Sequence, residues 1–123
     1  MIGTLVDEFS FAVEAGKVRE FARAIGDPSD DVPLTFTAVA AHHRDARAAV
    51  EKLGLDIRRV VVGEVEWSYA RPLVVGDELQ GRRVVVGVRE KGPMTFVELE
   101  TEYRDAAGEV ALRQRETLIE TGA

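Results

Sequence analysis

The amino-acid sequence predicts an α+β fold, and a change in hydrophobic periodicity carries this prediction. Up to about residue 55, apolar residues recur mainly at helical spacing, after one short stretch of alternation. Beyond that point they alternate with polar residues, which is the period of half-buried strands. At 123 residues the chain is long enough for one core. We therefore expect a single domain over residues 1–123, with helices packed on an antiparallel sheet.

A short strand opens the chain, because Phe9, Phe11 and Val13 alternate with small or polar residues. A helix follows, with apolar residues on one side and charged residues on the other. Its apolar positions are Val18, Phe21, Ala22 and Ile25. Gly26-Asp27-Pro28 ends this helix, because glycine and proline both interrupt helical structure.

A second, longer helix is expected over residues 34–53. It is rich in small residues, so another element can approach it closely. The small residues are Thr35, Thr37, Ala38, Ala40, Ala41, Ala46, Ala48 and Ala49. Gly54 directly follows Leu53 and predicts a C-terminal cap.

Four consecutive antiparallel strands complete the chain, over residues 58–70, 78–89, 94–104 and 109–120. The third alternates most clearly, with Val97, Leu99, Thr101 and Tyr103 on one face. Acidic residues of these strands, Glu64, Glu66, Glu98, Glu100 and Glu102, are expected on the face toward solvent or a second subunit. Residues 105–108, of sequence DAAG, predict the hairpin turn between the last two strands.

Composition excludes several classes of function. The net charge of −6 argues against nucleic acid as the main partner, because phosphate binding requires a basic surface. The absence of cysteine excludes disulfides, cysteine-based zinc sites and thiol catalysis. No apolar run is long enough to span a bilayer and nothing resembles a signal peptide, so a cytoplasmic protein without membrane contact is the simplest interpretation.

One local basic patch lies in this acidic sequence: Arg44, Arg47, Lys52, Arg58 and Arg59. The interpretation we favour is a solvated helix face followed by a loop. The alternative is a contact for the phosphates of coenzyme A or for an acidic acyl carrier protein.

Four segments, in order along the chain, resemble the MaoC-like dehydratase N-terminal domain family. Residues 17–28 are similar to its opening helix, and Pro33-Leu34-Thr35-Phe36 to the start of its central helix. Residues 71–77 and 94–101 resemble its Arg-Pro-Leu-x-x-Gly-Asp turn and its penultimate strand. The resemblance implies a hotdog fold, in which a curled antiparallel sheet wraps around a central alanine-rich helix.

The resemblance also implies a chemistry, the reversible addition of water across the double bond of a trans-2-enoyl thioester. The acyl group is carried on coenzyme A or acyl carrier protein, and neither cofactor nor metal is expected. An Asp, and a His about five residues later, act as acid and base in active members. Backbone amides at the start of the central helix hold the thioester oxygen, which makes Pro33, Leu34, Thr35 and Phe36 the expected substrate-binding residues.

This sequence departs from the catalytic motif. Asp27 follows Gly26, but the Asn-Pro-x-His that should come next is missing. Val62 stands where family members often have a second histidine. The histidines of this chain are His42 and His43, inside the alanine-rich segment. We expect them to be mainly structural, and because adjacent helical residues point to different faces, a shared metal site is not expected.

Three hypotheses follow. The first is a non-catalytic subunit of an (R)-specific enoyl-thioester hydratase or 3-hydroxyacyl-thioester dehydratase. This subunit shapes the acyl channel, while a second MaoC-like hotdog subunit supplies Asp and His. The second is an active homodimeric hydratase or thioesterase that uses Asp27 or Glu64 with His42 or His43. The third is a protein that binds acyl thioesters without catalysis.

Overall fold

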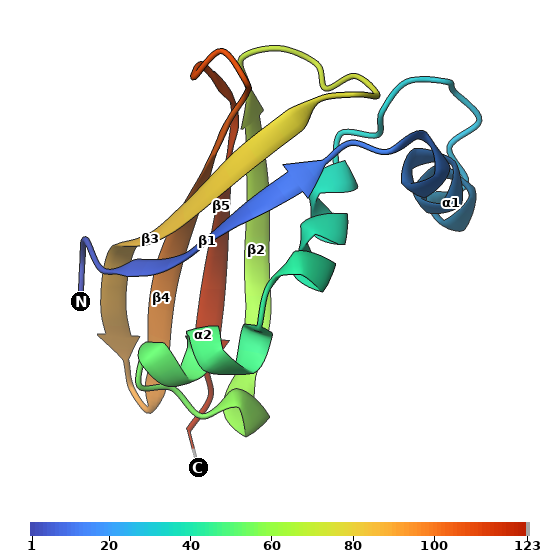
Figure 1. Ribbon diagram of the computed structural model, residues 1–123. Helices are drawn as coiled ribbons and strands as arrows, with labels where there is room; N and C mark the ends of the chain where they lie inside the picture. Colours follow the sequence, from blue (N-terminus) through green and yellow to red (C-terminus); the bar gives the residue numbers. More distant parts are fainter. Residues whose placement is uncertain (123) are drawn as a thin grey trace.

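The chain folds into one curled sheet with its helical segments on the concave side (Figure 1). The computed structural model describes residues 1–122, apart from the side chains of His42 and His43. Its elements, with η denoting a 3₁₀ helix, are β1 (Leu5–Ala12), α1 (Ala15–Ile25), η1 (Phe36–His43), α2 (Ala46–Lys52), η2 (Ile57–Arg59), β2 (Val60–Tyr69), β3 (Glu78–Lys91), β4 (Met94–Arg104) and β5 (Val110–Glu120). The predicted α+β class is confirmed.

The strands lie in the order β1-β3-β4-β5-β2, with every neighbouring pair antiparallel. The bounds expected for the four later strands hold to within two residues. The prediction that the four later strands pair in sequence order, as a meander, is correct only for β3, β4 and β5. β2 pairs with β5 at the far edge, because the segment after Tyr69 crosses the end of the sheet before β3 begins.

Alternation places the side chains of β4 as expected. Val97, Leu99, Thr101 and Tyr103 are at most 1% exposed and face the helices. The glutamates between them face outward, where Glu100 and Glu102 form ion pairs with Arg113 of β5. The acidic residues of this strand therefore belong to the outer, charged face of the sheet.

The expected single helix over residues 34–53 is wrong. The structure divides it into η1 and α2, with Arg44 extended between them at φ −130° and ψ 152°. Asp45 begins α2 as its N-cap, since its carboxylate accepts a hydrogen bond from the Ala48 amide at 3.0 Å. The predicted helix end is confirmed, because Gly54 takes a left-handed φ of 74°.

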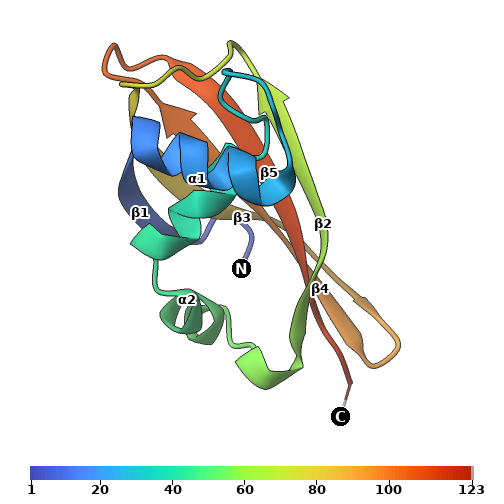
Figure 2. The same cartoon turned by 90° about the vertical axis from the view of Figure 1, so that its right-hand side faces the viewer.

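η1 and α2 follow one another along the concave face, between β1 and β2, and α1 packs on the side of η1 that faces away from the sheet (Figure 2). Phe36 of η1 is fully buried against the rings of Phe11 and Phe21. The buried Thr37 hydroxyl donates to Gln114 and accepts from the Trp67 indole, both at 2.7 Å. These contacts fix η1 to β2 and β5. Among the described residues, the structure contains no helix long and apolar enough to cross a membrane.

Candidate functional site

The segment expected to bind substrate, Pro33 to Phe36, forms the entry to η1. Pro33 and Phe36 are buried in the core, whereas Leu34 is 67% exposed. The Leu34 carbonyl accepts a hydrogen bond from the Tyr69 hydroxyl, and the Phe36 amide donates to the Pro33 carbonyl. Because its hydrogen is already bonded, the Phe36 amide is not free for a thioester oxygen in this conformation.

Asp27 lies in the turn after α1. Its carboxylate accepts a hydrogen bond from the Ser29 amide at 2.8 Å, and its own amide donates to the Ala22 carbonyl. This is an aspartate turn at a helix end, where Gly26 takes a left-handed φ of 74°. Asp27 has a structural role that requires no catalytic partner.

The other candidate acids and bases do not meet Asp27 in the described structure. Glu64 is exposed on β2 and lies two residues from Glu66, which faces the outer surface beside Ser68 and Arg113. Glu64 therefore points away from the helical side. The backbone of His42 and His43 belongs to the end of η1, but their side chains lie outside the described residues, so their predicted roles stay predictions.

The Arg71–Asp77 turn is a structural clamp. The Arg71 guanidinium donates to both carboxylate oxygens of Asp77, at 2.9 and 3.1 Å, and to Asp105 at 3.2 Å. These bonds tie the crossover before β3 to the hairpin before β5. The hydrogen bond from Arg71 lowers the pKa of Asp77 below its usual value.

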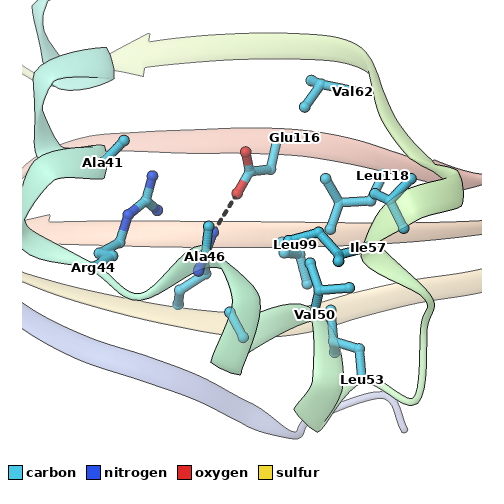
Figure 3. A pocket seen from close by; sticks show the side chains of 13 residues that line it. Ala41, Arg44, Ala46, Val50, Leu53, Ile57, Val62, Leu99, Glu116 and Leu118 are labelled. Atoms are coloured by element: carbon cyan, nitrogen blue, oxygen red, sulfur yellow. Dashed lines mark hydrogen bonds and ion pairs between the residues drawn. The ribbon is translucent and has the colours of Figure 1, made fainter.

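A pocket lies between α2 and the concave face of the sheet, and we call it the inner pocket (Figure 3). Its volume is about 220 Å³. It is lined by Ala41, Arg44, Ala46, Ala49, Val50, Leu53, Ile57, Val60, Val62, Arg83, Leu99, Glu116 and Leu118. Most of its wall is aliphatic, and its charged groups gather at the end next to η1. Val62, which is 57% exposed, lines it from the edge strand β2.

The charged end is built around Arg83. Its guanidinium forms two hydrogen bonds with Asp7, at 3.0 and 2.8 Å, and a third with Glu116 at 2.8 Å. The Arg83 side chain is 8% exposed. Burial acts to lower the pKa of Arg83, but the hydrogen bonds and charges of Asp7 and Glu116 outweigh it and raise this pKa. Arg83 therefore stays charged, and it holds Glu116 at the pocket wall.

Arg44 corrects the interpretation of the basic patch. Arg47, Lys52 and Arg58 are exposed as expected, but Arg44 is half-buried and lines the inner pocket. Its Nη1 atom is buried and has no hydrogen-bond partner among the described residues. The guanidinium lies over the Phe9 ring, with Cζ 5.3 Å from the ring centroid.

The sequence did not identify this site. Arg44, Arg83 and Glu116 come from segments far apart in the chain, and only the strand order brings them together. One local signal was available. Arg44 stands directly before an N-cap aspartate, at a position that a continuous helix would place on a solvated face.

The comparisons with known proteins match this chain to one family. The family model described as FAS1-like, dehydratase domain region, matches residues 30–114. A UPF0336 protein of Streptomyces griseus is 30% identical over 131 residues, which cover 93% of this chain and 87% of that protein. The chain belongs to this dehydratase-region family.

Two solved structures of dehydratases confirm the predicted hotdog fold. A MaoC-like dehydratase superposes with a TM-score of 0.83 at 24% identity. The superposition covers 99% of this chain but 42% of the dehydratase, so this chain spans less than half of that protein. The 3R-hydroxyacyl-ACP dehydratase complex HadBC of Mycobacterium tuberculosis has a TM-score of 0.74 at 21% identity, covering 96% of both chains.

Because the chain belongs to this family, the lining of the inner pocket can be compared with the groups that hydration of a double bond requires. Hydration needs an acid and a base within hydrogen-bond reach of the same water. Glu116 is engaged by Arg83, and no histidine appears among the described pocket residues. The lining of the pocket suits an aliphatic group, and its described residues present no free acid–base pair.

Proposed function

We propose that this chain is the non-catalytic subunit of an (R)-specific enoyl-thioester hydratase or 3-hydroxyacyl-thioester dehydratase. It contributes part of the acyl channel, and a second hotdog subunit contributes the Asp and His that carry out the chemistry. The substrate is an acyl group carried on coenzyme A or acyl carrier protein. The complex works in the cytoplasm and uses no other cofactor.

One observation carries this proposal. A chain of the dehydratase family contains an aliphatic pocket, while its one remnant of the catalytic motif, Asp27, is bonded into a turn. A subunit that has kept the acyl-binding function and lost the catalytic one would have this combination of features.

The size and position of the pocket support a paired arrangement. At about 220 Å³ the inner pocket is smaller than the roughly 300–1,000 Å³ typical of small-molecule sites. It reaches the edge strand β2 through Val62, where a second subunit could extend its wall. HadBC, which shares the fold, is itself a complex.

The test compares hydration by this chain alone with hydration by the pair. The chain is purified alone and also co-expressed with a MaoC-like chain of the same organism that carries the intact Asp and His motif. Loss of trans-2-octenoyl-CoA is followed at equal protein concentrations, with the acyl carrier protein thioester as a second substrate. We expect no turnover by this chain and faster turnover by the pair than by the partner alone.

Turnover by this chain alone would contradict the proposal. In that case Asp27→Asn and His43→Gln should each abolish activity if the homodimeric alternative is correct. If the chain binds the thioester but never increases the partner's activity, the binding-only alternative replaces the proposal.

A further inference from the structure

We propose that Tyr69 is a positioning residue for the acyl thioester. Its hydroxyl holds the peptide group between Leu34 and Thr35, so that the Thr35 amide donates to the carbonyl oxygen of the bound thioester. This inference rests on the proposed function, and it names the donor that the segment from Pro33 to Phe36 offers to that oxygen.

The Leu34 carbonyl is held by a side chain and not by the helix that follows it. In a regular first turn this oxygen would accept from the amide of Thr37 or Ala38. The Ala38 amide donates to the Thr35 carbonyl, and no amide of the described residues donates to Leu34. The Tyr69 hydroxyl is the donor in its place. Burial raises the pKa of Tyr69 to about 12, so the hydroxyl keeps its proton at neutral pH.

The hydrogen bond from Tyr69 also sets the direction of the Thr35 N–H. The Leu34 carbonyl and the Thr35 amide belong to one planar peptide group, and none of the described peptide bonds is cis. In a trans peptide the C=O and the N–H point to opposite sides. The Thr35 N–H therefore points away from the Tyr69 hydroxyl.

The Thr35 amide is a donor without an acceptor among the residues that the structure describes. The next amide, that of Phe36, already donates to the Pro33 carbonyl. Leu34 is 67% exposed and Thr35 is half-buried, so the peptide group between them lies near the surface. An N–H that is held in place before the ligand arrives stabilises a carbonyl oxygen without a cost of reorganisation.

A second pair of hydrogen bonds holds the chain on the other side of Thr35. The Thr37 hydroxyl accepts from Trp67 and donates to Gln114, both at 2.7 Å. Trp67 and Tyr69 are two residues apart on β2 and therefore point to the same face of the sheet. Thr35 is the N-cap of η1 but forms no capping bond with its own side chain. Side chains of β2 therefore fix the start of η1.

Two ligands that differ in one carbonyl group test the proposed donor. Octanoyl-CoA is a thioester without a double bond to hydrate, and S-octyl-CoA is the matching thioether, which lacks the carbonyl oxygen. Each is titrated by calorimetry into the co-expressed pair of this chain and its catalytic partner. Tyr69→Phe should weaken octanoyl-CoA binding about three- to tenfold and leave S-octyl-CoA binding unchanged.

Tyr103→Phe is the matched control. The Tyr103 hydroxyl is buried, and it has no hydrogen-bond partner in the described part of the chain. Its removal should change neither dissociation constant. The ¹⁵N chemical shift of Thr35 in the full labelled chain reports on the hydrogen bond to the carbonyl of the same peptide group. This shift should change in Tyr69→Phe and stay the same in Tyr103→Phe.

Equal weakening of both ligands by Tyr69→Phe would indicate a purely structural role and overturn the inference. Unchanged octanoyl-CoA binding, or an unchanged Thr35 shift, would overturn it as well. If the pair hydrates trans-2-octenoyl-CoA but Tyr69→Phe has no selective effect, only this inference is wrong. If the selective effect is present but the pair hydrates nothing, only the proposed function is wrong. A pair that binds neither ligand contradicts both.

Discussion

At the scale of single residues, Arg83 has the largest electrostatic role in the inner pocket. It joins Asp7 on β1 to Glu116 on β5 by reaching across β4, where the small Thr101 lies opposite it in the register. Two carboxylates from distant strands thus share one buried cation. This arrangement gives the Glu116 carboxylate a buried countercharge at the wall of a mostly aliphatic pocket.

We expect Arg83→Met to destabilise the chain by about 3 kcal/mol, because it leaves two partly buried carboxylates without a countercharge. Arg82→Met is the matched control. Arg82 is the neighbouring residue, but its ion pair with Glu8 is well exposed, so its loss should change the free energy of unfolding by less than about 0.5 kcal/mol. Urea unfolding monitored by circular dichroism measures both. Equal effects of the two substitutions would show that the Arg83 cluster contributes no special stability.

At the scale of elements, the sequence predicts correctly the features that neighbouring residues decide. It does not predict the features that depend on residues far apart in the chain. The four later strands were predicted to within two residues because alternation is decided within each strand. The prediction of one helix over residues 34–53 is wrong for two reasons. An alanine-rich sequence has no amphipathic period that would mark a break, and the prediction takes no account of Asp45 as a helix cap. The position of β2 beside β5 depends on non-local pairing, and no periodic pattern encodes it.

In the candidate site, too, only the features that neighbouring residues decide could be predicted from the sequence. The turn role of Asp27 could be predicted from its neighbours, Gly26 and Pro28. The meeting of Arg44 with Arg83 and Glu116 could not, because it depends on the strand order and on the break between η1 and α2.

The start of α2 is testable through its cap. Asp45→Ala removes the carboxylate that accepts from the Ala48 amide, so we expect a loss of about 1 kcal/mol in the free energy of unfolding. Because α2 forms one wall of the inner pocket, its amides should also exchange with deuterium faster. Glu51→Ala, at an exposed position of the same helix, is the control and should cause neither change. If the α2 amides of Asp45→Ala exchange with deuterium as slowly as those of Glu51→Ala, the cap does not maintain α2.

At the scale of the whole molecule, the position of β2 links fold and assembly. β2 pairs only with β5 in the described part of the chain, so its other edge offers free backbone hydrogen-bonding groups. Val61 and Val62 on this strand are 53% and 57% exposed. Under the proposed function we place the second subunit at this edge, because its valines are exposed and Val62 also lines the inner pocket.

Val61→Lys tests this surface by placing a charge where an interface would exclude water. We expect the dissociation constant of the complex, with itself or with a catalytic partner, to rise about tenfold or more, which corresponds to about 1.4 kcal/mol. Val74→Lys is the matched control, because Val74 is also 57% exposed but lies in the crossover before β3. Sedimentation velocity over a concentration series measures both variants. If Val74→Lys weakens association as much as Val61→Lys does, the effect is not specific to β2 and the proposed interface is wrong.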